Sequence, residues 1–192
     1  MSICGKIITG SSSDCDNPVV AGVRDDLILI NFDDFEAAVK TENATNKLII
    51  EGIVLGTGIT GYKYEGVRNS NVPTYEMEDK GFTTLFKHHV GFKIFKNDGA
   101  TKDNIEQLAK GRYVAIFENV AKGANGSAAY EILGYDSGLI ATVVSRNPTD
   151  DATQGAYDIM LENSTASLEP HLPRTLFITD YATTTAVVDS LV

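Results

Sequence analysis

The sequence predicts a mainly β protein, and three observations support this prediction. Short runs rich in Val, Ile, Thr, Tyr and Phe recur along the 192 residues and are separated by turn residues, among them many of the 17 glycines. Only one segment combines helix start and stop signals with an apolar stripe. The length and a hydrophobic content of 43% indicate a single folded domain over residues 1–192.

Residues 1–24 are predicted to form an N-terminal arm ahead of the folded body, because the first strong strand signal is the run LILINF at 27–32. No basic segment followed by an apolar run opens the chain, so we expect no export signal. For the same reason we expect Cys4 and Cys15 to be free and reduced thiols. Such an arm either remains loose or packs on a neighbouring subunit.

Two strands are predicted at 47–55 and 59–66, and the glycines between them predict a tight turn that joins the two strands as a hairpin. The following segment, 67–80, is polar and interrupted by Pro73, so we expect a long loop or an edge segment there. The segment 33–46 begins with aspartates, as short helices do, but it has no sustained apolar stripe.

The longest predicted strand covers 81–95, where aromatic and aliphatic residues share one parity and two lysines share the other. This alternation predicts one buried and one wetter face, and strands of this length often belong to a barrel or to an arm that joins a neighbour. The clear helix signal follows at 101–111, with Asp103 as the expected N-cap and Gly111 as the end. Its single apolar stripe predicts packing against a sheet.

The rest of the chain predicts further strands. A hairpin is expected around Asn125-Gly126, between strands at 112–120 and 127–134. Three more strands are expected at 138–145, 156–163 and 174–179, for a total of about eight strands with one clear helix.

No residue set in the sequence has the pattern of an active site. His88 and His89 are adjacent in a predicted strand, so their side chains point to opposite faces and cannot share one metal ion. His171 lies in a loop without a second histidine at ligand spacing, and no strained serine or cysteine turn is present. We therefore predict no catalytic, metal or cofactor-binding residues, and a protein that is not an enzyme.

The net charge of the chain argues against nucleic-acid binding. The formal net charge is -10 and the sequence pI is about 4.7, so the field of the protein should repel phosphate backbones, and acidity also favours solubility. No apolar run approaches the ~18 residues of a membrane span, so no membrane partner is expected.

The order of the parts resembles the tail-tube subunits of phages and prophages from Bacteroidetes-type hosts. An N-terminal arm precedes LILINFDD, then come a hairpin ending in GYKYEG, a polar loop and the long strand FTTLFKHHVGFKIF. A short helix follows, and after it RYVAIFEN and YEILGYDSGL. The resemblance covers most of the chain and lies in this pattern of segments.

The resemblance implies a β-sandwich or half-barrel with one short flanking helix and long loops. It implies a structural virion protein whose copies form stacked, hexameric rings, assembled in the bacterial cytoplasm into a tail tube together with other tail proteins. Double-stranded DNA would pass through an acidic lumen without specific binding. The loop at 67–80 and the arm are the expected contacts between subunits, through Val67, Arg68, Asn69, Tyr75 and Glu76.

Two other classes share this profile. Another virion component, such as a tail terminator, a connector or a decoration protein, would differ in its oligomeric geometry. A ligand-binding β-sandwich outside phage biology would use aromatic stacking, for which Tyr62, Tyr64 and Tyr75 are the candidates, although the chain has no Trp. An enzyme would need a pocket with perturbed carboxylates.

Overall fold

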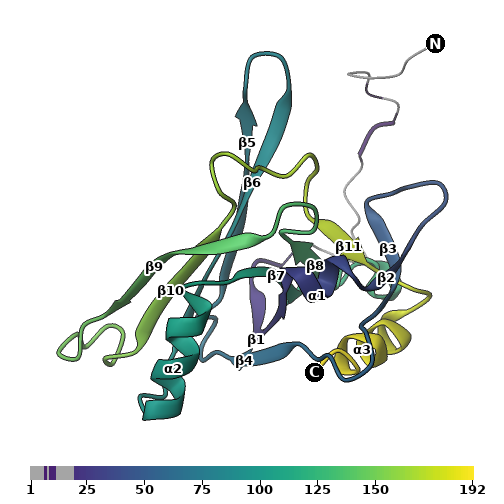
Figure 1. Cartoon of the computed structure of the whole chain (residues 1–192). Helices are drawn as coiled ribbons and strands as arrows, with labels where there is room; N and C mark the ends of the chain where they lie inside the picture. The colour runs from purple at the N-terminus through teal and green to yellow at the C-terminus, as the bar shows by residue number, and fades with distance from the viewer. Residues whose placement is uncertain (1–6, 8, 12–19) are drawn as a thin grey trace.

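The structure is a computed structural model that describes residues 7, 9–11 and 20–192, and it is mainly β, as predicted (Figure 1). The described residues form eleven strands, three α-helices and one short 3₁₀ turn, Ala124–Gly126. The strands are β1 Val23–Asn31, β2 Val39–Glu42, β3 Ile49–Val54, β4 Tyr62–Glu65, β5 Val72–Asp79, β6 Thr84–Ile94, β7 Arg112–Asn119, β8 Tyr130–Leu133, β9 Leu139–Arg146, β10 Tyr157–Glu162 and β11 Arg174–Leu176. The helices are α1 Phe32–Glu36, α2 Gly99–Leu108 and α3 Tyr181–Asp189.

The sheet branches at β7. β1 runs antiparallel along one side of β7, and β4 adds to the other side of β1. The opposite side of β7 is shared, because Arg112 and Tyr113 pair with β9 whereas Ala115–Glu118 pair with β8. From β8 the sheet continues through β11 and β3 to β2, and from β9 it continues through β10 and β6 to β5. The two branches therefore end in two different edge strands.

Two apolar cores lie on opposite faces of β1 and β7. Ile28 and Ile30 of β1 belong to one core, whereas Leu27 and Leu29 belong to the other. This arrangement explains why LILINF shows no polar alternation, since a strand that is buried on both faces needs apolar residues at every position. Helices α1 and α3 pack on the first core, and α2 packs on the second through Ile105.

The prediction of one flanking helix is wrong in number, because three helices are present among the described residues. α2 is the predicted helix, but it begins earlier: Asp98, not Asp103, is its N-cap, since Asp98 Oδ1 accepts the Thr101 N–H at 2.8 Å. α3 was not predicted. Its Thr- and Val-rich sequence has a low intrinsic helix propensity, and the Asp180 cap and packing on the core stabilise it nevertheless.

The predicted hairpin between 47–55 and 59–66 is also wrong. Both strands form, as β3 and β4, but β3 pairs with β2 and β11 whereas β4 pairs with β1. The reason is that they belong to different cores: Ile50 lies in the first core, and the Tyr64 ring packs 5.2 Å from the Phe92 ring beside the second. The glycine-containing connection spans two branches of the sheet.

Two predicted boundaries change. The segment 67–80 is not one long loop, because β5 occupies 72–79 as an edge strand, which is the alternative that the sequence left open. The N-terminal arm is shorter than 1–24, because Val23 and Arg24 already belong to β1. Residues 1–6, 8 and 12–19, with Cys4 and Cys15, lie outside the described residues.

The other predicted strands are confirmed at their positions, including the hairpin of β7 and β8. Its turn places Asn125 at φ 55° and Gly126 at φ 84°, the left-handed backbone that this residue pair tolerates best. None of the helices in residues 20–192 is long and apolar enough to cross a membrane.

Candidate self-assembly surfaces

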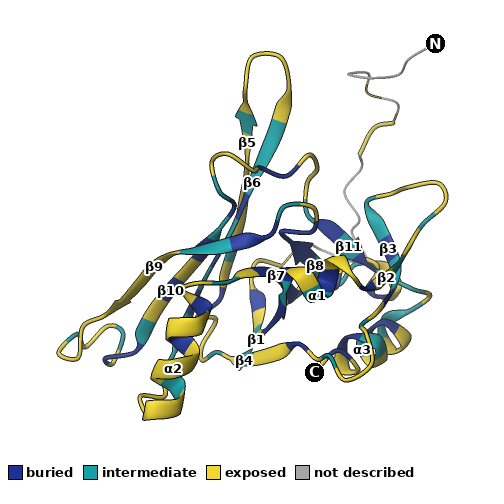
Figure 2. Cartoon of the chain, viewed as in Figure 1, coloured by how far each residue is buried: buried dark blue, intermediate teal, exposed yellow. Residues whose placement is uncertain are grey.

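Two strongly exposed apolar side chains lie on one projecting element. β5 and β6 form a hairpin that extends beyond the body of the molecule, and its outer part is largely solvent-exposed (Figures 1 and 2). Phe82 at its tip is fully exposed, and Met77 is 66% exposed. An aromatic ring in water on a protruding hairpin is unfavourable for an isolated molecule, so the tip has the character of a contact surface.

The outer edge of β5 carries unpaired backbone groups. Phe86 exchanges two backbone hydrogen bonds with Glu169. The His88 carbonyl accepts the Asn163 N–H, and the His88 N–H donates to Asn163 Oδ1, so in the antiparallel pattern the alternate residues of β6 bond to β5. The register pairs Tyr75 and Met77 with the residues that face away from β5. The N–H and C=O groups of these two residues therefore point to the open edge. Pro73 shares this parity, which explains why a residue without an N–H is tolerated there.

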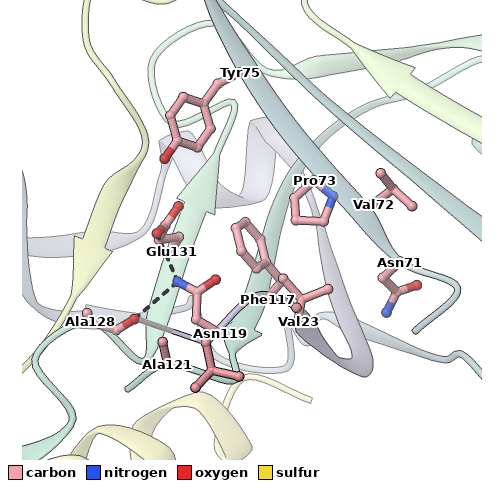
Figure 3. Close-up of a pocket in the computed structure, with 12 residues that line it drawn as sticks. Val23, Asn71, Val72, Pro73, Tyr75, Phe117, Asn119, Ala121, Ala128 and Glu131 are labelled. Carbon is pink, nitrogen blue, oxygen red and sulfur yellow. Dashed lines mark hydrogen bonds between the residues drawn. The ribbon is translucent and has the colours of Figure 1, made fainter. Parts of the chain in front are cut away.

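A groove follows this edge (Figure 3). Its volume is about 510 Å³, and its walls are mainly apolar, with Val23, Val72, Pro73 and Phe117 among them. A second hollow of about 360 Å³ lies beside β11 and shares Tyr75 and Glu131 with it, so the two hollows adjoin at these residues. We call the two hollows together the β5 groove.

Glu131 is the charged group of the β5 groove. Its Oε1 accepts a hydrogen bond from Asn119 Nδ2 at 2.8 Å, and burial raises the pKa of its carboxyl. Among the described residues, no lysine, arginine or histidine lies within ion-pair distance of this carboxylate. The groove therefore presents a partly desolvated acid to any occupant.

The predicted interface residues are divided between surfaces. Val67, Arg68 and Asn69 line a separate hollow of about 440 Å³ with Phe95, whereas Tyr75 lies in the β5 groove. The loop before β5 is held by its own chain, since Asp25 Oδ1 accepts the Asn69 N–H at 2.6 Å. Arg68 and Asn69 both have left-handed backbone, at φ 54° and 57°. This loop is thus a rigid surface rather than a loose connection.

Glu76 belongs to a third surface, the outward face of β10, β6 and β5. This face carries four carboxylates and two lysines: Glu76, Glu78, Asp158, Glu162, Lys87 and Lys93. Lys87 pairs with Glu162 at 2.8 Å, and Lys93 pairs with Asp158 at 2.9 Å. Lys80, just after β5, also pairs with Glu78, so all three lysines are neutralised and the carboxylates exceed them by one negative charge.

A further hollow lies at the end of the molecule opposite the hairpin tip, between β4 and α2 (Figure 1). It measures about 590 Å³ and is lined by Leu108 together with Tyr62, Tyr64 and Tyr113. Because Tyr75 lies on β5, the three tyrosines considered for ligand stacking do not form one site. The hollow is aromatic and large enough to receive a side chain from another molecule.

The two adjacent histidines lie on opposite faces, as predicted: His88 is 1% exposed and His89 is half-buried. His88 Nδ1 accepts the Gly134 N–H at 3.3 Å, and Nε2 donates to the His171 carbonyl at 3.0 Å. This pairing requires the neutral ring, and burial lowers the pKa of His88 to about 4. His88 therefore has a structural role.

Beside His88 lies a buried carboxylate that the sequence analysis missed. Glu169 is 1% exposed, and its two oxygens accept the N–H groups of Asp136 and Ser137 at 3.0 and 2.8 Å. Burial raises its pKa. Arg174 pairs with Asp136 at 3.0 Å in the same corner. Only the tertiary fold places Glu169 against this turn, and no local sequence signal identifies it.

The His88 geometry gives a pH prediction. The unfolded chain protonates His88 near pH 6.5 and the folded protein only near pH 4, so the free energy of unfolding should fall by up to about 3 kcal/mol as the pH is lowered across this interval. Glu169 opposes this trend, because its raised pKa favours the folded state in acid. Urea unfolding of the wild type and of His88→Gln between pH 7 and 4 isolates the contribution of His88 to the pH dependence of the free energy of unfolding. If this free energy changed equally with pH in both proteins, the prediction for His88 would be wrong.

Comparisons of the chain with protein-family models, with curated proteins and with solved structures give no match. Within residues 20–192, no group of three or more His, Cys, Asp or Glu side chains is arranged to hold a metal ion.

Proposed function

We propose that the chain is the repeating subunit of a self-assembling tube, of the phage tail-tube type. The observation that carries this proposal is the combination of a projecting apolar hairpin tip and an aromatic hollow at the opposite end of the molecule. A tip and a receptor at opposite ends produce head-to-tail contacts, which repeat without limit along an axis. Phe82 is the anchor, and the hollow between β4 and α2 receives it.

Lateral association uses the open sheet edges. β5 and β2 end the two branches of the sheet, and in the described part of the chain each pairs with only one strand. Val39 on β2 is 68% exposed and is the apolar residue of this edge. Edges of this kind invite pairing with a strand from another copy of the chain, and such strand addition joins the copies into a ring.

The charge distribution supports passage of DNA through such a tube. The outward face of β10, β6 and β5 would line the channel. Its carboxylates outnumber its lysines, and the lysines are already paired with carboxylates. A surface of this sign does not collect phosphate groups, since binding to a nucleic-acid backbone needs free cations. DNA would slide along this face without specific contacts.

Negative-stain electron microscopy over a concentration series, with light scattering for mass, tests the proposal. We expect monomers or small oligomers at low concentration and hollow rings or tubes at high concentration. Closed rings that never stack would favour a terminator or connector instead. A strictly monomeric particle at every concentration would refute self-assembly.

A further inference from the structure

The β5 groove offers three features to an occupant. Tyr75 and Met77 direct unpaired backbone groups to the open edge, the walls are apolar, and Glu131 has no cationic partner among the described residues. An added strand satisfies the backbone groups, its apolar side chains fill the walls, and a basic side chain balances the carboxylate. The fitting occupant is an extended, apolar segment with one positive charge.

The N-terminal segment of this chain has that composition. Residues 3–8 read ICGKII, with three isoleucines of high β-propensity, and Lys6 is the only charged side chain in residues 1–13. Charge complementarity therefore selects this segment for a groove whose charged group is an acid.

The length of the connecting chain indicates which copy supplies the segment. Val20 lies at the end of the groove where β5 begins, since it lines the groove together with Val72. If residues 12–19 of the same chain extended along β5 from Val20, they would span about 26 Å. This is the full length of the eight-residue strand β5. Residues 3–8 would then lie past the strand, and Asp14 and Asp16 would lie near Glu131, where like charges repel.

We propose that residues 3–8 of a second copy of the chain add as a strand to the open edge of β5, with Lys6 beside Glu131. This inference rests on the proposed self-assembly and specifies one of its contacts. It extends the predicted role of the N-terminal arm by giving the arm a receptor site and a charge pair.

Cross-linking of the full-length chain tests the contact. In a Cys15→Ser background, Tyr75→Cys places a thiol on the β5 edge, and Cys4 is the native thiol of the segment. Equal amounts of ¹⁵N-labelled and unlabelled copies are mixed and mildly oxidised. We expect disulfide-linked peptide pairs that join Cys4 of one copy to the cysteine at position 75 of another, with one peptide labelled and the other unlabelled. Cross-links only within single copies, or none, would overturn the proposal.

Charge reversal gives an independent test. Lys6→Glu and Glu131→Lys should each raise the concentration for half-assembly by at least about fivefold, and the double variant should recover most of this loss. Lys102→Glu, a reversal on the exposed surface of α2, is the matched control and should have little effect. Additive losses in the double variant would contradict the pairing of Lys6 with Glu131.

The two proposals fail differently. If the wild type forms tubes but Lys6→Glu assembles like Lys102→Glu and the cross-link is absent, the strand contact is wrong and the tube proposal stands. If the wild type stays monomeric and no mixed cross-link forms, both are wrong. Deletion of residues 1–11 should weaken assembly like Lys6→Glu, and it leaves Val23 and the second core intact.

Discussion

Replacement of Phe82 by serine should abolish tube formation while leaving the subunit folded. Phe82 is fully exposed at the hairpin tip, so its removal takes no contact from either core. Burial of one phenylalanine on docking contributes about 1.5–3 kcal/mol per contact, and a stacked assembly loses this at every repeat. We expect the concentration for half-assembly to rise at least about tenfold, measured by light scattering and electron microscopy.

Thr83→Ser is the matched control for this prediction, because the position is adjacent and also exposed. It should assemble like the wild type. Circular dichroism and thermal unfolding should be the same for all three proteins. Normal tubes from Phe82→Ser would show that the hairpin tip is not an axial anchor, and a lower melting temperature would show that Phe82 has a folding role instead.

Replacement of Glu169 by alanine should give the largest loss of stability among single polar substitutions. Both carboxylate oxygens accept backbone N–H groups, from Asp136 and Ser137, and the residue is buried. Two part-buried backbone donors without acceptors cost up to about 1–3 kcal/mol each, and the deleted side chain adds a cavity. We expect the free energy of unfolding to fall by about 3–5 kcal/mol in urea titrations at pH 7.

Glu169→Gln keeps one carbonyl oxygen and should lose less than half as much. Glu106→Ala, on the exposed face of α2, should change stability by less than about 0.5 kcal/mol. A small loss for Glu169→Ala would mean that water replaces the carboxylate in this corner. Assembly should remain normal for the Gln variant, because the corner lies apart from the hairpin tip.

Predictions that depend on a local signal are confirmed with one exception: Phe82 shares the predicted buried parity of the 81–95 strand but is fully exposed, because it lies in the turn before β6 begins. Alternation in β6 placed Val90 and Phe92 inside, adjacency separated His88 from His89, and Asn125-Gly126 marked the turn between β7 and β8. Each of these depends only on neighbours in the chain and on the two-residue period of a strand. The apolar stripe of α2 was found for the same reason, although its cap was misplaced by a second aspartate in the segment.

The errors occurred where the partner is distant. β3 and β4 were predicted to pair because a glycine-rich connection joins them, but side-chain packing assigned them to opposite cores. β5 was read partly as loop because Pro73 and its acids are unfavourable inside a sheet, and they are tolerated on an open edge. The contact surfaces share this difficulty, since Tyr75 and Glu131 meet in one groove only after β5 and β8 are placed.

The sequence by itself therefore determined the mainly β class, most strand positions and the acidic character of the chain, because composition, periodicity and turn residues are local properties. Only the tertiary structure decided the branching at β7, the two cores, the open edge of β5 and the burial of Glu169. These features depend on contacts between residues far apart in the chain. Their free energy comes from the packing of two cores against β1 and β7, which no local pattern encodes.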